Sequence, residues 1–368
     1  MNIAIIGIRG IPANYGGFET CAENVSKYWA EKGHRVLVYC RKHQYNITLK
    51  EYNGCSLKYI SSVRTKSFDT LSHTLLCCLN LIFTEPSYRY VHLYNAGNGI
   101  FIPLLKLFKR KVIVSVDGAE WKRIKWGLLG KLMHKVGAWM AVTFADGVVT
   151  DNKIVEMYYK ERFNYVTATI AYGAKLIDTE LCDAENILGK YGLSKKGYFI
   201  FVGRLVPEKG VHTLIAAYEQ LNTTMPLVII GDDKDGEYKN SLLKQKNDKI
   251  IFLGYVYGTQ YEVLLQNALI YVSASELEGT SPSLLAAMGA RVCALVNGIE
   301  ENRETVKGCA YCYDSGLNNN LLVVWQQLIN NLNLIEQMGE KGYKLVNNEY
   351  RWDRIANQYL ELFVKLNK

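Results

Sequence analysis

Two cations in the second half of the chain have the types and the spacing needed to hold a diphosphate. Arg204 and Lys209 follow the apolar run Phe201–Val202 five residues apart, and Gly203 precedes the first of them. Arginine can bond two phosphate oxygens at once, whereas lysine acts as a movable point charge. This pattern favours a binding site for a phosphate-containing ligand, although an arginine and a lysine at this spacing are also common on ordinary protein surfaces.

A second segment, Ser275–Met288, predicts the start of a helix beside a carboxylate. Ser281 is a favourable N-cap, and Pro282 is a favourable first helical residue. The free N–H groups of that turn, together with Gly279-Thr280, would direct a positive dipole toward a leaving phosphate. Glu278 precedes this expected anion site and suits the binding of sugar hydroxyls, unless it is a solvated loop acid.

The first loop of the chain, residues 7–17, contains four glycines between an expected strand and an expected helix. Adjacent Gly16 and Gly17 would let backbone N–H groups approach an anion at the start of that helix. The glycines lack the spacing G-x-G-x-x-G, and Arg41 follows the second expected strand where an acid would bind the ribose of NAD. The loop therefore favours phosphate binding, or a tight turn alone, over an NAD-dependent dehydrogenase.

Asp117 follows the apolar run Val112–Val116, so we expect it to face the ligand. Cations and tryptophans come directly after it, namely Trp121, Lys122, Arg123, Lys125 and Trp126. This mixture suits an anionic bilayer or an acceptor diphosphate, and it also fits an amphipathic surface helix with packed tryptophans. Residues 1–175 carry 24 Lys and Arg against 12 Asp and Glu. Nucleic acid is disfavoured as a partner, because no nucleic-acid-binding motif accompanies the charge.

Short β-rich runs alternate with amphipathic segments along most of the chain, which is typical of α/β units with parallel sheets. The expected strands are Ile3–Ile6, Arg35–Cys40, Tyr90–Tyr94, Val112–Val116, Gly147–Thr150, Ala168–Ala171, Tyr198–Val202, Leu227–Ile230, Ile250–Leu253, Leu269–Val272 and Cys293–Val296. We expect two doubly wound domains, 1–175 and 176–350, with 351–368 returning to the first one. Such sheets bind ligands at the carboxyl ends of their strands, so the cleft between the domains is the expected active site.

The composition is that of a folded protein without a membrane span. A chain of 368 residues is longer than a single hydrophobic core usually supports, which favours two domains. Hydrophobic residues make up 49% of the sequence. We find no apolar run of about 20 residues and no secretory signal, so we expect a cytoplasmic protein. Nine scattered cysteines suit a reducing compartment, and Cys309 and Cys312 lack the further ligands that a metal site needs.

These motifs together resemble the retaining GT-B glycosyltransferases of family 4, in the same order over nearly the whole chain. The strings that are similar to a bacterial branch containing rhamnosyltransferases of capsule and cell-wall polysaccharide synthesis are Ile6–Thr20, Val116–Arg123 and Gly279–Leu285. The resemblance implies a GT-B fold, in which two Rossmann-like domains face each other across a cleft. It further implies a nucleotide-sugar donor in the second domain, an acceptor in the first, retention of anomeric configuration, and no required metal or other cofactor.

By the same resemblance, Arg204 and Lys209 would bind the donor diphosphate, and the Gly16-Gly17 amides would approach its distal phosphate. Glu278 would meet the donor sugar, and Asp117 would orient the acceptor or its proton. The acceptor is expected to be a lipid-linked sugar, carried on a polyprenyl diphosphate at the inner face of the cell membrane. Donor contacts are also expected at Gly203, Gly279, Thr280 and Ser281.

One position departs from the family pattern. A second glutamate usually follows the first by eight residues and contacts the nucleotide ribose, but here that position is Ala286. A deoxyribose donor such as dTDP-rhamnose has one fewer hydroxyl to bond, which favours it slightly. The sequence leaves three other functions open: a transferase using a UDP-hexose, a nucleotide-sugar epimerase of the same fold, and an inactive nucleotide-sugar-binding protein.

Overall fold

The computed structural model describes residues 1–14, 16–65, 68–116, 128–179, 183–233, 236–317 and 320–366. The chain divides into two compact units, which we call the N-terminal unit (Met1–Tyr172 with Trp352–Lys368) and the C-terminal unit (Gly173–Arg351). The boundaries predicted from the sequence are residues 175 and 350. Within the described residues, no helix has the length and apolar character that crossing a bilayer requires.

The N-terminal unit is built on a sheet in which the order of the described strands is β3-β4-β2-β1-β5-β6-β7-β8. All neighbouring pairs are parallel except β3 with β4. The strands are β1 (Asn2–Ile6), β2 (Arg35–Arg41), β3 (Glu51–Tyr52), β4 (Cys55–Ile60), β5 (Tyr90–Tyr94), β6 (Lys111–Val116), β7 (Gly147–Thr150) and β8 (Ala168–Thr169). The order turns in opposite directions on the two sides of β1, as in a doubly wound sheet.

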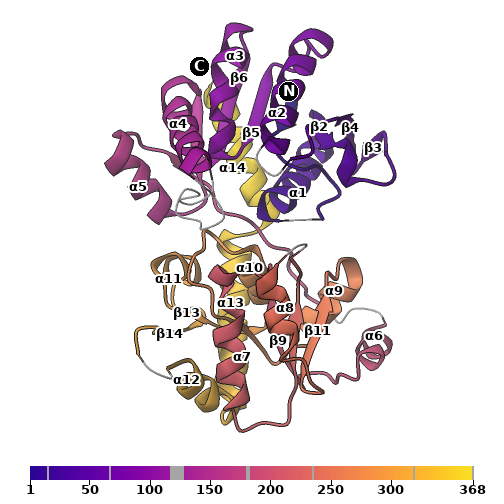
Figure 1. Ribbon diagram of the computed structural model, residues 1–368, viewed down its shortest axis with the longest axis vertical. Coiled ribbons are helices and arrows are strands. Elements are labelled where there is room, and N and C mark those ends of the chain that lie inside the picture. Colours follow the sequence, from indigo (N-terminus) through magenta and orange to yellow (C-terminus); the bar gives the residue numbers. More distant parts are fainter. Residues whose placement is uncertain are drawn as a thin grey trace. The chain divides into compact units, whose positions relative to one another are not determined.

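Helices cover both faces of this sheet (Figure 1). One face packs on α2 (Asp69–Thr84), α3 (Ile102–Leu107), α4 (Leu128–Phe144) and α5 (Lys153–Phe163), whose apolar residues share one core with alternate strand residues such as Ala4 and Ile6. The other face packs on α1 (Gly17–Glu31) and α14 (Trp352–Lys365), where Trp29 contacts His92 and Phe363. The 3-10 turns are η1 (Lys42–Gln44) and η2 (Ala96–Phe101). The last helix is thus part of the N-terminal unit.

The C-terminal unit has a parallel sheet in which the described strands follow the order β11-β10-β9-β12-β13-β14. Its strands are β9 (Phe199–Val202), β10 (Leu227–Ile230), β11 (Ile250–Gly254), β12 (Ile270–Ser273), β13 (Cys293–Asn297) and β14 (Tyr311–Tyr313). Its helices are α6 (Ala184–Lys190), η4 (Pro207–Lys209), α7 (Val211–Glu219), α8 (Glu237–Leu243), α9 (Gly258–Gln266), α10 (Pro282–Gly289), α11 (Glu300–Val306), α12 (Asn320–Ile329) and α13 (Leu332–Glu349). Counted from β9, this order is 3-2-1-4-5-6, the Rossmann arrangement.

The prediction of two Rossmann-like α/β folds is therefore confirmed, with differences at the sheet edges. Central strands such as β9, β10 and β12 are buried runs rich in Val, Ile and aromatic residues, which is why the sequence pattern found them. None of the strands expected from the sequence lies within residues 44–71, but the structure has β3 and β4 there. In β4, exposed Ser56 and half-buried Lys58 interrupt the apolar residues, because this strand lies near a sheet edge and is only partly covered.

Candidate functional site

The site in the C-terminal unit follows from the strand order. In a doubly wound sheet, ligands bind outside the carboxyl ends of the strands where the order reverses, and here that point lies between β9 and β12. Arg204 follows β9 by two residues, and Glu278 follows β12 by five. Two of the residues singled out from the sequence therefore lie after the two strands that flank the reversal point.

Lys209 and Glu278 form an ion pair between the lysine Nζ and the carboxylate Oε1. Their side chains are only 17% and 11% exposed, so little water screens the two charges. The sequence proposed both residues for one site but did not foresee that they contact each other. Each charge of this pair is balanced by the other.

Backbone contacts hold the η4 turn against the segment after β12. The N–H of Glu276 donates to the carbonyl of Glu208 at 3.0 Å, and the Ser275 hydroxyl donates to the same carbonyl at 3.3 Å. Gly210 closes the turn with a φ of +63°, and a Cβ at this position would lie 2.1 Å from the carbonyl oxygen of Ala274. Only glycine fits both the left-handed backbone and the close approach. This contact brings Lys209 to Glu278.

Backbone hydrogen bonds fix the residues on both sides of Arg204. The guanidinium of Arg204 has no hydrogen-bond or ion-pair partner within the described part of the chain. The N–H of Gly203 donates to the Ile230 carbonyl at 3.0 Å, and that of Leu205 donates to Asp232 at 3.3 Å. The Arg204 side chain itself is half-buried. A cation held in this way is available to bond an anionic ligand.

The start of α10 departs in one detail from the expectation. Ser281 occupies the N-cap position, but its hydroxyl makes no capping bond to the backbone. Instead it pairs with the hydroxyl of Ser283 at 3.3 Å, which in turn pairs with the Tyr271 hydroxyl at 3.0 Å. Gly279, Thr280 and Ser281 are buried. The first N–H groups of α10 are therefore not satisfied by the side chain of Ser281.

The glycine loop of the N-terminal unit also lies where its strand order reverses, between β1 and β5. Gly7 and Gly10 have structural roles, since a Cβ on either would lie within 3 Å of Tyr94 or Cys40. Gly16 and Gly17 lie at the N-terminus of α1, as predicted. Within the first turn, the buried Glu19 carboxylate accepts the N–H of Arg9 at 2.9 Å.

Glu19 is a residue that the sequence reasoning missed. Burial raises the pKa of its carboxyl, against the lowering effect of the bond from Arg9 and the charges of Arg9 and Arg41. A carboxylate in the first turn of α1 competes with a phosphate for the same positive helix end. Gly16-Gly17 therefore offer backbone N–H groups to an anion, but with an acid already beside them.

The predicted acceptor and membrane segment cannot be described. Asp117, Trp121, Lys122, Arg123, Lys125 and Trp126 all lie outside the described residues. Ser115, at the end of β6 just before that segment, is buried and bonds His92 at 2.8 Å and the Tyr359 hydroxyl at 3.2 Å. The roles expected for the segment stay predictions.

Two aromatic residues after β11 were also missed. Tyr255 and Tyr257 stack with their ring centroids 5.9 Å apart and their planes within 19°, and both side chains are exposed. Aromatic residues directly after a strand whose carboxyl end faces the ligand edge would have been the signal. An exposed stacked pair at this edge can receive a planar group.

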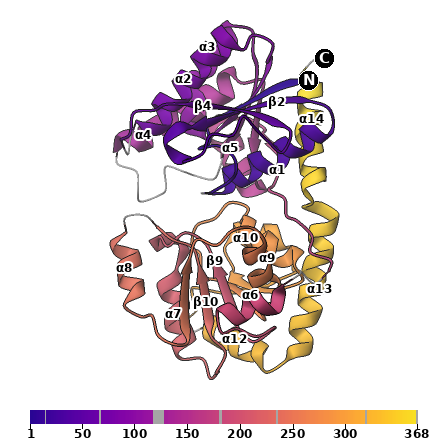
Figure 2. The same ribbon diagram turned by 90° about the vertical axis from the view of Figure 1, so that its right-hand side faces the viewer.

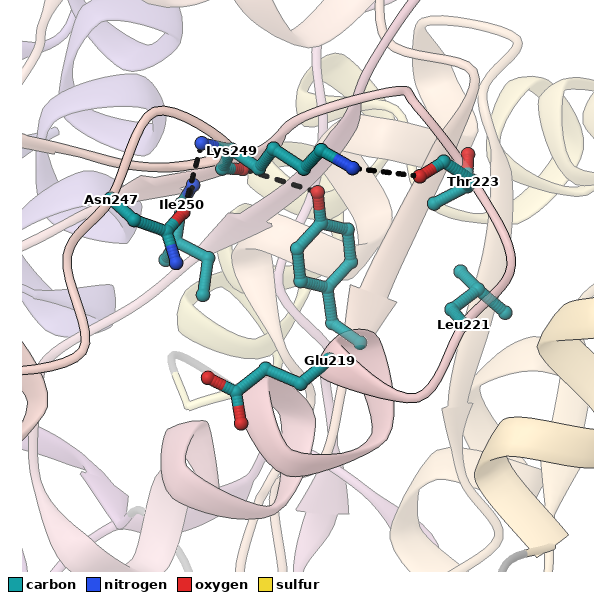
Figure 3. Close-up of a pocket in the computed structure, with 7 residues that line it drawn as sticks. Glu219, Leu221, Thr223, Asn247, Lys249 and Ile250 are labelled. Atoms are coloured by element: carbon teal, nitrogen blue, oxygen red, sulfur yellow. Dashed lines mark hydrogen bonds between the residues drawn. The ribbon is translucent and has the colours of Figure 1, made fainter.

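The pocket in Figure 3 lies near the amino ends of β10 and β11, whereas the candidate site lies at the carboxyl ends of the strands. The pocket therefore does not belong to this site. It is lined by residues at the end of α7 and before β10 and β11, and its volume is about 170 Å³. Tyr218 and Lys249 already bond backbone carbonyls there. A volume below about 300 Å³ is small for a nucleotide-sized ligand. Among the described residues, no three His, Cys, Asp or Glu side chains are grouped as a metal site would need.

Comparisons with known proteins agree with this geometry. Residues 183–345 match the family described as Glycosyl transferases group 1, and residues 1–175 match a domain of unknown function, DUF1972. An uncharacterized glycosyltransferase of Methanocaldococcus jannaschii is 27% identical over 326 residues, which are 83% of this chain and 75% of the relative. The O-antigen chain mannosyltransferase B of Escherichia coli is 25% identical over 163 residues, which are 42% of each chain.

Solved structures resemble the whole chain. Sucrose-phosphate synthase from Thermosynechococcus elongatus has a TM-score of 0.83 at 18% identity, covering 99% of this chain and 98% of that one. Anabaena HepE in complex with UDP-glucose has a TM-score of 0.81 at 17% identity, covering 99% and 100%. The fold is therefore GT-B, and residues 183–345 are similar to the group 1 glycosyl transferases. The family match and the names of the relatives support glycosyltransferase activity for this chain.

Proposed function

We propose that this glycosyltransferase is a retaining hexosyltransferase that moves rhamnose from dTDP-rhamnose to a lipid-linked sugar diphosphate in capsule or cell-wall polysaccharide synthesis. It would work at the inner face of the cell membrane and without a metal. One observation carries the donor half of this proposal: Arg204 and the Lys209–Glu278 pair follow the two strands that flank the reversal point of a Rossmann sheet.

The chemistry needs positive charge where the diphosphate departs. Negative charge builds on the leaving diphosphate in the transition state, and cations already in position stabilise it most. Arg204 would bond two phosphate oxygens, and Lys209 would turn from Glu278 toward the diphosphate. Glu278, released from Lys209, would then accept hydroxyls of the donor sugar. The two members of this ion pair would thus supply both ligand contacts.

The stacked pair Tyr255 and Tyr257 would receive the nucleobase. Both rings follow β11, two strands away from β9 in the same sheet, and both are exposed. A nucleobase is planar, and its stacking on aromatic side chains does not depend on which polar groups the base carries. This contact supports a nucleotide donor of either kind, thymidine or uridine.

Ala286 supports the choice of a deoxyribose donor. It lies just past the middle of α10 and is half-buried, and its methyl group has no atom that can bond a hydroxyl. A charge-assisted hydrogen bond to ribose is worth about 1.5–3 kcal/mol, so a ribonucleotide would lack this contribution here. A deoxyribose has one fewer hydroxyl to leave unbonded.

The acceptor half of the proposal belongs to the N-terminal unit. Asp117 would orient the acceptor or its proton, and the cations and tryptophans of residues 121–126 would hold the acceptor diphosphate at an anionic membrane. The Escherichia coli relative is named an O-antigen chain mannosyltransferase, which supports a growing polysaccharide as the acceptor. The Gly16-Gly17 amides would approach the distal phosphate of the donor.

A UDP-hexose is the second candidate donor, and one observation favours it. Anabaena HepE, whose structure resembles this chain over 99% of its length, is solved in complex with UDP-glucose. The same two cations and the same carboxylate would bind that donor. The two candidate donors therefore differ in their sugar and nucleotide but not in the residues that bind them.

Calorimetric titration with dTDP-rhamnose, dTDP, UDP-glucose and UDP separates these candidates. We expect the tightest binding for dTDP-rhamnose. A preference for UDP-glucose over dTDP-rhamnose would refute the rhamnosyl assignment and leave the transferase intact. Absence of binding by all four ligands would refute the donor site itself.

A further inference from the structure

The outer surfaces of α2, α3 and α4 expose large apolar side chains. We call this surface the α2–α4 face and define it by Leu75, Leu76 and Phe83 on α2, Leu107 and Phe108 at the end of α3, and Leu132, Val136, Trp139 and Phe144 on α4. The three helices lie beside one another on one side of the N-terminal sheet (Figures 1 and 2). Single exposed apolar residues are ordinary, but a group on adjacent helices marks an interaction surface.

In helix α4, small residues face the core and large apolar residues face outward, which is the reverse of an ordinary amphipathic helix. Its buried face is small: a Cβ on Gly137 would lie 2.2 Å from the carbonyl of Ala96, and Ala138 and Ala141 join the core. Leu132 and Trp139 instead point outward and are 58% and 51% exposed. A surface helix normally places large apolar residues on the core and polar residues outside. The exposed side of α4 is therefore suited to an apolar environment.

The other two helices extend the apolar surface. Phe83 on α2 is 71% exposed and meets the ring of Phe108 with centroids 5.9 Å apart, and Leu107 is 76% exposed. On α4, Trp139 contacts the ring of Phe144. Two pairs of exposed aromatic side chains on this surface are thus in ring contact.

Among the described residues, the charges near these side chains are mostly positive. Glu85, which follows α2, pairs with Lys58 at 2.7 Å. Lys109 and Lys135 are exposed and Lys131 is half-buried, whereas Asp69 is the one acid in the three described helices and pairs with Arg41. The acid that follows α4, Asp146, pairs with Lys106 at 2.7 Å and lies 3.5 Å from Lys111. Apolar and aromatic side chains with lysines beside them and few carboxylates are typical of surfaces that bind anionic lipid.

We propose that the α2–α4 face docks on an anionic lipid bilayer. Leu107, Phe108, Leu132 and Trp139 enter the boundary between headgroups and acyl chains, and Lys109, Lys131 and Lys135 contact the anionic headgroups. A second copy of the chain fits this surface less well, because a two-fold contact would bring its lysines together. The inference deepens the proposed function and rests on it in one respect, since a lipid-linked acceptor is reached at a bilayer.

Co-sedimentation of the full chain with vesicles tests the proposal. The vesicles are phosphatidylcholine alone, or phosphatidylcholine with about one third phosphatidylglycerol. The apolar variant is Leu107→Ser, Leu132→Ser, Trp139→Ser, and the charge variant is Lys109→Gln, Lys131→Gln, Lys135→Gln. We expect the wild type to bind anionic vesicles in a salt-dependent manner. The apolar variant should bind at least tenfold less, and the charge variant should lose the salt dependence.

A matched control removes exposed apolar side chains elsewhere. Val323→Ser with Leu332→Ser changes two exposed residues of the C-terminal unit and should leave vesicle binding unchanged. Titration with dTDP-rhamnose in every variant shows whether the donor site is intact, so failure of the donor proposal and failure of the docking proposal are read separately. Wild-type protein that stays in the supernatant overturns the docking proposal, as does an apolar variant that binds like the wild type. An apolar variant that instead converts a dimer to a monomer also overturns it.

Discussion

At the scale of single residues, the contact between Lys209 and Glu278 has consequences for both stability and binding. Replacing Lys209 by Met leaves the Glu278 carboxylate without its partner in a place where it is only 11% exposed. Breaking a buried pair costs roughly 3–5 kcal/mol, and because this pair keeps some contact with water we expect a loss of about 1–3 kcal/mol. Urea unfolding of Lys209→Met against the wild type measures it.

The double variant Lys209→Met, Glu278→Gln is the control for this prediction. Removing both charges should recover most of the lost stability, while sugar transfer stays abolished because both ligand contacts are gone. Equal stability of the single and double variants would show that the unpaired Glu278 carboxylate is not the cause of the loss, and an active double variant would remove both residues from the site.

A second pair, Arg41 and Asp69, predicts a dependence of stability on pH. Burial alone would raise the pKa of the Asp69 carboxyl, but the hydrogen bond from Ser62 and the charge of Arg41 outweigh burial and hold that pKa below its ordinary value. Asp69 therefore contributes stability that is complete above about pH 4 and is lost as the pH falls through the lowered pKa.

We expect Asp69→Asn to lower the free energy of unfolding by about 1–2 kcal/mol at pH 7, because the buried Arg41 guanidinium loses its counter-charge. The variant should also lose less stability than the wild type between pH 5 and pH 3. Urea titrations at several pH values measure both effects. Parallel pH curves for the two proteins would show that Asp69 does not titrate as inferred.

Sequence reasoning singled out Arg204, Lys209 and Glu278 because each follows an expected strand, and the structure places them after β9 and β12. It missed the ion pair, since Lys209 and Glu278 are 69 residues apart and meet only through the packing of two loops. It missed Glu19 because a glutamate in a helical first turn is ordinary, and only the structure shows it buried against the loop.

At the scale of elements, Gly210 fixes the η4 turn against the segment after β12. In Gly210→Ala the added Cβ would lie 2.1 Å from the Ala274 carbonyl oxygen, so the turn must shift. We expect weaker donor binding and a stability loss larger than the roughly 1 kcal/mol cost of a left-handed alanine alone. Unfolding and donor titration measure the two effects.

Gly192→Ala is the matched control, because Gly192 has a φ of +66° and no atom near its Cβ position. It should show the backbone cost only, with unchanged donor affinity. Similar effects of the two substitutions would show that the close approach at Ala274 has no influence on the site.

Elements buried on both sides were predictable, and elements at edges were not. β9, β10 and β12 are continuous apolar runs, whereas β4 and the short β14 are partly covered, so their patterns resemble loops. The sequence also could not show that the large apolar residues of α4 face outward. Its periodicity is that of an amphipathic helix, and only the contact of Gly137 with Ala96 shows which side is buried.

At the scale of the whole molecule, the last helix ties the end of the chain to the N-terminal unit. The indole of Trp29 donates to the Ala356 carbonyl at 3.0 Å, and Tyr359 and Phe363 are buried beside it. Deleting residues 352–368 should therefore lower amide hydrogen exchange protection in residues 1–172 and leave residues 173–351 nearly unchanged. A loss of protection confined to residues 173–351 would contradict this assignment of the helix.

The central claim is that a nucleotide-sugar donor binds where the strand order of the C-terminal sheet reverses. The most direct measurement is the affinity of Arg204→Gln for dTDP-rhamnose compared with the wild type, by calorimetric titration. Arg204 has no side-chain partner among the described residues, so this change should leave the fold intact. We expect binding about 10- to 100-fold weaker, since charged hydrogen bonds to the diphosphate are lost. Wild-type affinity in the variant would contradict the claim.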